Sequence, residues 1–146
     1  MSQSKLNTIT DAEWEVMRVV WTKEKTTSRE VQVVLKEKKA WKATTVKTLL
    51  SRLVEKKLLA TEKLGNKYLY YPLVAERQSV ETVAEELLGK VCSRKVGTVV
   101  TSVLADSLLS FDDIDQLEAL LKEKRQTAVQ EVPCNCTPGQ CQCHLN

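Results

Sequence analysis

The sequence predicts a mainly α-helical protein with one small β-hairpin and a cysteine-rich tail. Only four Gly and three Pro occur in 146 residues, which leaves little room for long irregular segments. Apolar residues recur at helical spacing through most of the chain. One stretch near the middle instead places short β-prone runs on both sides of Gly65-Asn66. Four of the five cysteines lie in the last thirteen residues, where too few apolar residues surround them to build a core.

The composition is that of one ordinary soluble domain or of two small ones. Hydrophobic residues make up 42% and charged residues 28%. No run of about 18 apolar residues occurs, so we expect no membrane span, and no apolar segment follows the first residues, so we expect no signal peptide. A cytoplasmic location is therefore expected, where thiols stay reduced and a cysteine cluster more often binds metal than forms disulfides.

The net charge of +3 hides an uneven distribution along the chain. Residues 1–75 carry 15 Lys and Arg against 8 Asp and Glu, or +7, whereas residues 76–146 carry 7 against 11, or −4. The basic half is expected to face an anionic partner, although basic surfaces are also common on proteins that bind no nucleic acid.

Two capped helices open the basic half. Thr10 and Glu13 have the spacing of a capping box, and the helix behind them is expected to end near Lys23. Thr27 or Ser28 can cap a second, shorter helix. The apolar residues of both helices are expected to face a core: Trp14, Met17, Val20, Trp21, Val31, Val34 and Leu35.

A third helix is predicted from about Thr44 to Lys57. Its apolar residues fall within one sector: Val46, Leu49, Leu50 and Leu53. Hydroxyls and cations make up the opposite face and its margins: Thr44, Thr45, Lys47, Thr48, Ser51 and Arg52. Short hydroxyls flanked by cations can reach base edges and phosphates in a DNA major groove. A merely solvated face is the alternative, but such a face more commonly mixes Glu and Lys, which form helices better than Thr and Ser do.

A basic hairpin follows this helix. Two β-prone runs between 59 and 72 flank the turn at Gly65-Asn66, with Lys63 and Lys67 on either side of it. Three helices followed by a basic hairpin is the order of a winged helix-turn-helix, in which the third helix enters the major groove and the wing lies along the phosphates. We therefore interpret 1–75 as a DNA-binding domain, with Lys63, Asn66 and Lys67 as its wing contacts.

Three more amphipathic helices are predicted in 76–126, the last of them capped at Ser110. So many branched side chains exceed what one small subunit can bury, so we expect this region to pair with a second copy as a homodimer. Packing on the first half is the alternative. The residues expected at the dimer contact are Val80, Val83, Leu87, Val91, Val99, Val103, Leu117 and Leu120. Cys92 is interpreted as a small buried hydrophobe rather than a reactive thiol.

The tail, 127–146, carries the spacing Cys-x-Cys-x4-Cys-x-Cys, formed by Cys134, Cys136, Cys141 and Cys143. A turn at 137–140 can fold the second pair onto the first. Four thiolates without a carboxylate suit Zn(II) or Cu(I). Structural zinc sites usually place two to four residues between paired cysteines, so the tighter spacing favours a small copper–thiolate cluster. Two disulfides or unliganded thiols are the alternative, and His144 is interpreted as incidental.

Enzymatic activity is not expected. The sequence shows no catalytic triad, no pair of carboxylates set in a pocket and no Gly-rich phosphate loop. The single His lies in the tail, so catalysis by a His acid or base would have to take place there.

With these features in place, the chain resembles the copper-responsive CopY-type repressors of the BlaI/MecI family. Three segments and the tail carry the resemblance: 12–21 (AEWEVMRVVW), 45–54 (TVKTLLSRLV), 68–72 (YLYYP) and the paired cysteines. The tail marks the CopY branch, because penicillinase-type members lack it. At the wing tip this chain has Gly65-Asn66-Lys67, where many relatives place Arg directly after the Gly.

The resemblance implies a homodimeric repressor that binds an inverted-repeat operator in double-stranded DNA ahead of copper-export genes. It also implies that Zn(II) in the four-cysteine site is compatible with DNA binding and that Cu(I), two ions per subunit, displaces it and releases the DNA. A copper chaperone that delivers Cu(I) is a further expected partner. The alternatives are a copper storage or donor protein and a penicillinase-type repressor inactivated by proteolysis.

Overall fold

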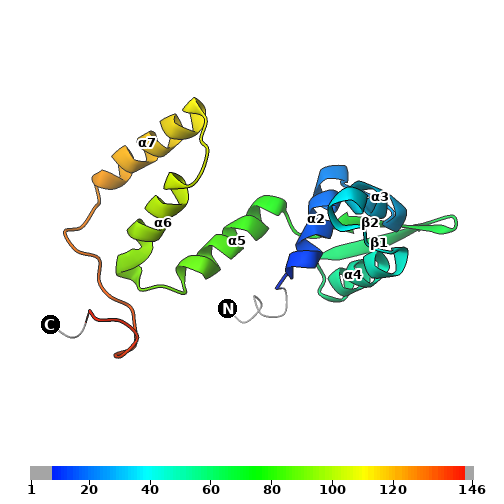
Figure 1. Ribbon diagram of the computed structural model, residues 1–146, viewed down its shortest axis with the longest axis horizontal. Helices are drawn as coiled ribbons and strands as arrows, with labels where there is room; N and C mark the ends of the chain where they lie inside the picture. Colours follow the sequence, from blue (N-terminus) through cyan, green and yellow to red (C-terminus); the bar gives the residue numbers. More distant parts are fainter. Residues whose placement is uncertain (1–7, 144–146) are drawn as a thin grey trace. The chain divides into compact units, whose positions relative to one another are not determined.

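The computed structural model describes residues 8–143, which divide between Glu81 and Thr82 into two compact units. In the first unit, helices are followed by a two-stranded hairpin (Figure 1). Its elements are α2 (Asp11–Lys23), α3 (Ser28–Lys39), α4 (Ala43–Glu55), β1 (Leu59–Leu64) and β2 (Lys67–Pro72). The predicted fold class, mainly helical with a winged helix and one small antiparallel hairpin, is confirmed.

Capping boxes fix the starts of α2 and α3. The Thr10 hydroxyl accepts a hydrogen bond from the Glu13 N–H at 3.2 Å, and the Glu13 carboxylate accepts one from the Thr10 N–H at 3.0 Å. Thr27 and Glu30 repeat the arrangement at α3, so Thr27 rather than Ser28 is the cap. Each box satisfies two backbone N–H groups near the helix start.

Helix α4 is slightly shorter than predicted, since it starts at Ala43 and ends at Glu55 instead of reaching Lys57. Lys57 has a φ of +63°, a left-handed conformation that ends a right-handed helix. The predicted apolar face is confirmed, because all four of its residues are buried: Val46, Leu49, Leu50 and Leu53.

The core of the first unit lies where α2, α3 and α4 meet the start of β1. Its buried hydrophobic residues are Val16, Met17, Val19, Val20, Val31, Leu35, Val46, Leu49, Leu50, Leu53, Leu58 and Leu59. The prediction that Val34 faces inward is wrong, since 51% of its surface is exposed. Val31 and Leu35 lie one turn apart and occupy the inward face of α3, which leaves Val34 outside.

An isolated β-bridge links the hairpin to the segment between α2 and α3. Strands β1 and β2 pair antiparallel along their full lengths and close over Gly65-Asn66. Gly65 has a φ of +63°, which glycine adopts at little cost. An isolated pair connects Thr26 with Tyr70: the Tyr70 N–H donates to the Thr26 carbonyl at 2.7 Å, and the Thr26 N–H donates to the Tyr70 carbonyl at 3.0 Å. The bridge fastens β2 to the connection between α2 and α3.

A buried ion pair links the start of α2 to the residue after α4. Glu13 is 1% exposed, and its carboxylate accepts a hydrogen bond from Lys56 Nζ at 2.5 Å. Burial alone would raise the pKa of Glu13, but hydrogen bonds from Lys56 and Thr10 outweigh it and lower that pKa below its ordinary value. Glu13 is therefore charged at neutral pH, and one carboxylate both caps α2 and holds Lys56.

The second unit contains η1 (Ser93–Lys95), α6 (Val96–Ala105) and α7 (Phe111–Arg125), while α5 (Glu76–Leu88) crosses the boundary between the units. Ser110 caps α7 as predicted. No residue of α5, α6 or α7 is buried in the single chain. Five of the eight residues expected at a dimer contact are about half exposed: Val80, Val83, Leu87, Val103 and Leu120. The other three are partly covered: Val91, Val99 and Leu117.

Nothing in residues 8–143 forms a helix that is both long and apolar enough to cross a membrane.

The substitution Lys56→Met tests the buried ion pair. It leaves the Glu13 carboxylate buried without its cation, which should cost about 3 kcal/mol of the free energy of unfolding at neutral pH. In the wild type the folded pKa of Glu13 lies below its ordinary value of 4.5. The ion pair therefore stabilises the fold above that pH, and this contribution is lost as the pH falls through the folded pKa.

In the variant, burial without the cation raises the pKa of Glu13, so the carboxylate becomes neutral at higher pH. We expect the stability difference between variant and wild type to shrink between about pH 7 and pH 4. Urea unfolding across this range measures the difference. Lys36→Met, at an exposed lysine of α3, is the control. A difference that does not change with pH would contradict the pairing.

Candidate functional site

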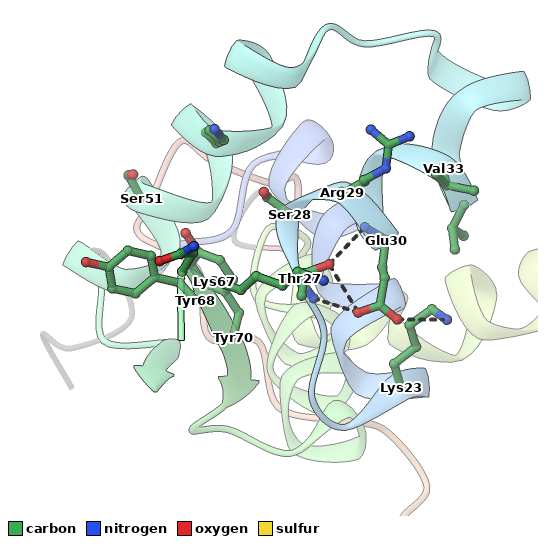
Figure 2. A pocket seen from close by; sticks show the side chains of 13 residues that line it. Lys23, Thr27, Ser28, Arg29, Glu30, Val33, Ser51, Lys67, Tyr68 and Tyr70 are labelled. Atoms are coloured by element: carbon green, nitrogen blue, oxygen red, sulfur yellow. Dashed lines mark hydrogen bonds and ion pairs between the residues drawn. The ribbon is translucent and has the colours of Figure 1, made fainter. Parts of the chain in front are cut away.

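The exposed face of α4 lines an open groove in the first unit. Lys47 and Ser51 of α4 line it together with Asn66 and Lys67 of the hairpin. These are four of the nine residues predicted to contact DNA. The groove has a volume of about 670 Å³, and Figure 2 shows side chains from α3, α4 and the hairpin around it. The structure therefore brings the predicted helix and the predicted wing to one surface.

The start of α3 supplies groove residues that the sequence analysis does not assign. Ser28 and Arg29 lie beside the groove, and Val33 and Val34 complete this wall. In a helix-turn-helix, the helix that precedes the recognition helix crosses the phosphate backbone. Arg29 adds a cation to the groove from α3, the helix that occupies this place in the fold. The capped start at Thr27, which is visible in the sequence, is the signal that could have drawn attention to this part of α3.

The groove is strongly cationic. Four cations line it, Lys23, Arg29, Lys47 and Lys67, against the single carboxylate of Glu30, a difference of 4 − 1 = +3. The Glu30 carboxylate accepts hydrogen bonds from the Thr27 N–H at 3.0 Å and the Thr27 hydroxyl at 3.1 Å. These bonds lower the pKa of Glu30 and keep it charged in its capping role. Such a groove is suited to a polyanion.

The other five predicted DNA contacts lie near the groove residues in sequence but do not line the groove: Thr44, Thr45, Thr48, Arg52 and Lys63. All five are exposed. The Thr48 hydroxyl donates to the Thr44 carbonyl at 2.9 Å, which leaves its oxygen free to accept. Lys63 Nζ lies 6.0 Å from the centre of the Tyr68 ring on the facing strand. Exposure makes these residues available to a ligand wider than the groove itself.

A thiol cluster is the second candidate site and lies within the second unit. Cys134 Sγ is 3.4 Å from Cys141 Sγ. The sulfurs of Cys92, Cys134, Cys136 and Cys141 all lie within 4.8 Å of one another. Cys143 Sγ lies 3.8 Å from Cys92 Sγ. None of the five cysteines forms a disulfide, and His144 lies outside the described residues.

The spacing of the sulfurs fits a soft metal ion. A tetrahedral zinc ion with Zn–S bonds of about 2.3 Å holds its four sulfurs about 3.8 Å apart. The observed Sγ–Sγ separations of 3.4, 3.6 and 3.8 Å are close to this distance. No carboxylate belongs to the group, so the donors suit Zn(II) or Cu(I) rather than Mg²⁺ or Ca²⁺.

The structure confirms the burial of Cys92 and adds a contact that the sequence analysis does not predict. The residue is buried as expected, with 5% of its surface exposed, but its sulfur belongs to the thiol cluster. A hydrogen bond from the backbone N–H of Arg94 lowers the pKa of the Cys92 thiol to about 6. Burial raises the pKa of Cys136 to about 12. The Cys92 sulfur therefore faces other thiols and does not lie in a purely apolar pocket.

Polar contacts hold the tail beside η1. The Ser93 N–H donates to Asn135 Oδ1 at 3.0 Å, and the Ser93 hydroxyl donates to the Pro133 carbonyl. Arg94 forms an ion pair with Glu131. The predicted turn is also present, since the Gln140 N–H donates to the Thr137 carbonyl at 3.0 Å.

Known proteins resemble this chain along most of its length. The sequence model of the penicillinase repressor family matches residues 9–123. An uncharacterised 16.5 kDa protein of the ptsI 3′ region of Latilactobacillus sakei is 39% identical over 94% of each chain. The penicillinase repressor of Bacillus licheniformis is 30% identical over 83% of this chain and 94% of its own. The solution structure of the DNA-binding domain of the repressor BlaI is 35% identical, with a TM-score of 0.45, and covers 49% of this chain and 87% of that domain.

The family match covers well over half of the chain, and both relatives align with nearly their full lengths. The chain therefore belongs to the penicillinase repressor family of DNA-binding transcriptional repressors.

Proposed function

We propose that this protein is a copper-sensing transcriptional repressor that works in the cytoplasm. A homodimer binds an inverted-repeat operator ahead of copper-export genes while the tail thiolates hold Zn(II). The same thiolates take up Cu(I), two ions per subunit and supplied by a copper chaperone, and the dimer then leaves the operator. The observation that carries the proposal is a cluster of thiols without carboxylates in a chain that also has the cationic groove of a DNA-binding repressor.

The first part of the proposal concerns DNA. Residues 1–75 recognise the operator, with α4 in the major groove and the hairpin along the backbone. Lys47 and Lys67 line the groove from the two sides of this arrangement. Two copies, paired through 76–126, present two such surfaces, and the symmetry of an inverted repeat matches that of a two-fold dimer.

The second part concerns the metal. Cys134, Cys136, Cys141 and Cys143, in 127–146, are the sensing ligands. Thiolates are soft ligands and suit Cu(I) as well as Zn(II). Bound Zn(II) offsets part of the negative charge of the thiolates and gathers them, and each of the four tail cysteines contributes one sulfur. The tight Cys-x-Cys pairs favour sulfurs shared between two ions, which is why uptake of Cu(I) is expected to change the arrangement of the tail.

Coupling between the two sites has a reciprocal consequence. If copper uptake weakens operator binding by a given factor, operator binding must weaken copper uptake by the same factor. A hundredfold effect corresponds to a coupling free energy of about 2.7 kcal/mol. This size is within the ordinary range for allosteric proteins.

Two other functions account for fewer of the observations. A copper storage or donor protein would need the thiols but not the cationic groove. A repressor inactivated by proteolysis would need the groove but not the thiols. Binding of operator DNA that responds to Cu(I) separates the proposal from both.

Replacement of all four tail cysteines by Ser should remove the response to copper while the repressor still binds DNA. Gel shifts with an inverted-repeat operator measure this in matched zinc-loaded and Cu(I)-loaded samples. The wild-type complex should dissociate in Cu(I), and the variant complex should persist. A wild-type complex that survives saturating Cu(I) would refute the sensor. A variant that still dissociates from DNA in Cu(I) would show that other residues sense copper.

Lys47→Ala and Arg52→Ala should each weaken operator binding. The loss should be about 1–3 kcal/mol for a base contact, and a phosphate contact should lower the salt slope of the binding constant by about 1. Lys36→Ala and Arg18→Ala, at exposed cations of α3 and α2 outside the groove, are matched controls. If Lys47→Ala and Arg52→Ala bind the operator as well as the controls do, α4 is not the recognition helix.

Leu120→Glu should weaken the dimer, because it places a charge at a half-exposed apolar position of α7. Ala119→Glu adds the same charge at an exposed position about 100° around the same helix, away from the apolar face, and should have a smaller effect. Sedimentation analysis over a range of concentrations should show a dimer dissociation constant at least about tenfold higher for Leu120→Glu alone. Equal behaviour of the two variants would refute the proposed dimer face.

A further inference from the structure

Cys92 lies far from the tail cysteines in sequence but next to them in space. It directly precedes η1, 42 residues before Cys134, and its sulfur is 3.6 Å from Cys134 Sγ and 3.8 Å from Cys143 Sγ. The side chain is 5% exposed. A buried thiol that faces two other thiols is in contact with donors and not with a purely apolar pocket.

We propose that Cys92 is a fifth thiolate ligand of the metal centre, so that metal binding ties the tail to the junction between α5 and α6. The inference rests on the proposed function only in requiring that the tail binds a soft metal ion. It adds a ligand that the Cys-x-Cys-x4-Cys-x-Cys motif does not contain, and with it a route from the metal to the helices.

The sulfur geometry supports this ligand set. Cys92, Cys134, Cys136 and Cys141 lie mutually within 4.8 Å, which is already the number of donors that one tetrahedral ion takes. Cys143, the remaining tail cysteine, approaches the set through Cys92. Cys92 is thus near the middle of the five sulfurs and not at their edge. Five thiolates exceed the need of one zinc ion, and the additional sulfur is available to a second soft ion.

The residues that follow Cys92 support its assignment as a ligand independently of any sulfur contact. Ser93 bonds to Pro133 and Asn135, the residues on either side of Cys134. Arg94 pairs with Glu131. The segment that follows Cys92 is therefore bound to the residues on both sides of Cys134. These bonds hold the two sulfurs at ligand spacing.

This arrangement gives the metal a mechanical connection to the helices. The junction at Cys92 lies between the end of α5, at Leu88, and the start of α6, at Val96. Both helices carry half-exposed apolar residues, among them Leu87 and Val103. A change in how Cys92 is ligated therefore acts on the junction between two helices of the proposed dimer face. The tail need not reach the DNA-binding surface to signal.

Metal titration of the full-length chain tests the ligand. Zinc affinity is measured by competition with a chromophoric chelator, and Co(II) serves as a probe because thiolate-to-cobalt charge-transfer absorbance grows with the number of bound thiolates. Cys92→Ser and Cys92→Ala should both weaken zinc binding at least about tenfold, since even loss of a partner that supports a ligand costs roughly 10- to 100-fold. Both should also lower the charge-transfer band.

The Ala variant separates ligation from packing, because it keeps an apolar side chain at a buried position. Wild-type zinc affinity and a wild-type cobalt band in both variants would overturn the inference. If the wild type and Cys92→Ser bind zinc equally well and the four-Ser tail variant does not bind, only this inference fails. If the wild type binds neither zinc nor Cu(I), the proposed function fails as well.

A second measurement has its main readout in the wild-type chain, which does not depend on how the Cys92 variants fold. Alkylation of Cys92 by iodoacetamide, followed by mass spectrometry, should be slow with zinc bound and at least about tenfold faster after chelation. In the four-Ser tail variant, zinc should not change the rate. Equal rates for the wild type with and without zinc would show that burial alone protects the thiol and would overturn the inference.

Discussion

The two hydrogen bonds between Thr26 and Tyr70 hold the hairpin against the segment between α2 and α3, beside the cationic groove. A two-stranded hairpin is only marginally stable by itself, so its orientation has to come from contact with the helices. Thr26 is fully buried, which shields both bonds from water. Strand β2 carries Lys67 and Tyr68 into the groove and, through Tyr70, is fastened beside the start of α3. The bridge therefore holds the hairpin beside the start of α3, and residues of both line the groove.

Local patterns in the sequence were enough to predict the elements of the first unit but not all of its groove. Capping boxes and the polar face of α4 depend on residues within a few positions of one another, so they can be read from one stretch of chain. The part played by Arg29 depends on how α3 packs against α4, and the wrong placement of Val34 has the same origin. Which apolar residues of α3 turn inward is decided by tertiary packing, and here they are Val31 and Leu35.

The thiol cluster shows the same limit more clearly. The spacing of Cys134, Cys136, Cys141 and Cys143 is a short motif, and its donor type alone indicates a soft metal. Cys92 lies 42 residues away from the motif, so no spacing rule connects it. Its burial could be predicted from its place near a helix end, but its neighbours could not. The fold brings it to the other sulfurs through the hydrogen bonds of Ser93 and the ion pair of Arg94.

The separation between Cys92 and Cys134 has a thermodynamic consequence for the second unit. No residue of α5, α6 or α7 is buried in the single chain, so side-chain burial within those helices contributes little to their order. A metal ion held at both ends of this segment closes a loop as a disulfide does. For a loop of this length, the loss of chain entropy in the unfolded state is worth about 4 kcal/mol. The bound metal ion would then also be a cross-link. Its presence or absence would set how much of the chain between α6 and the tail is folded.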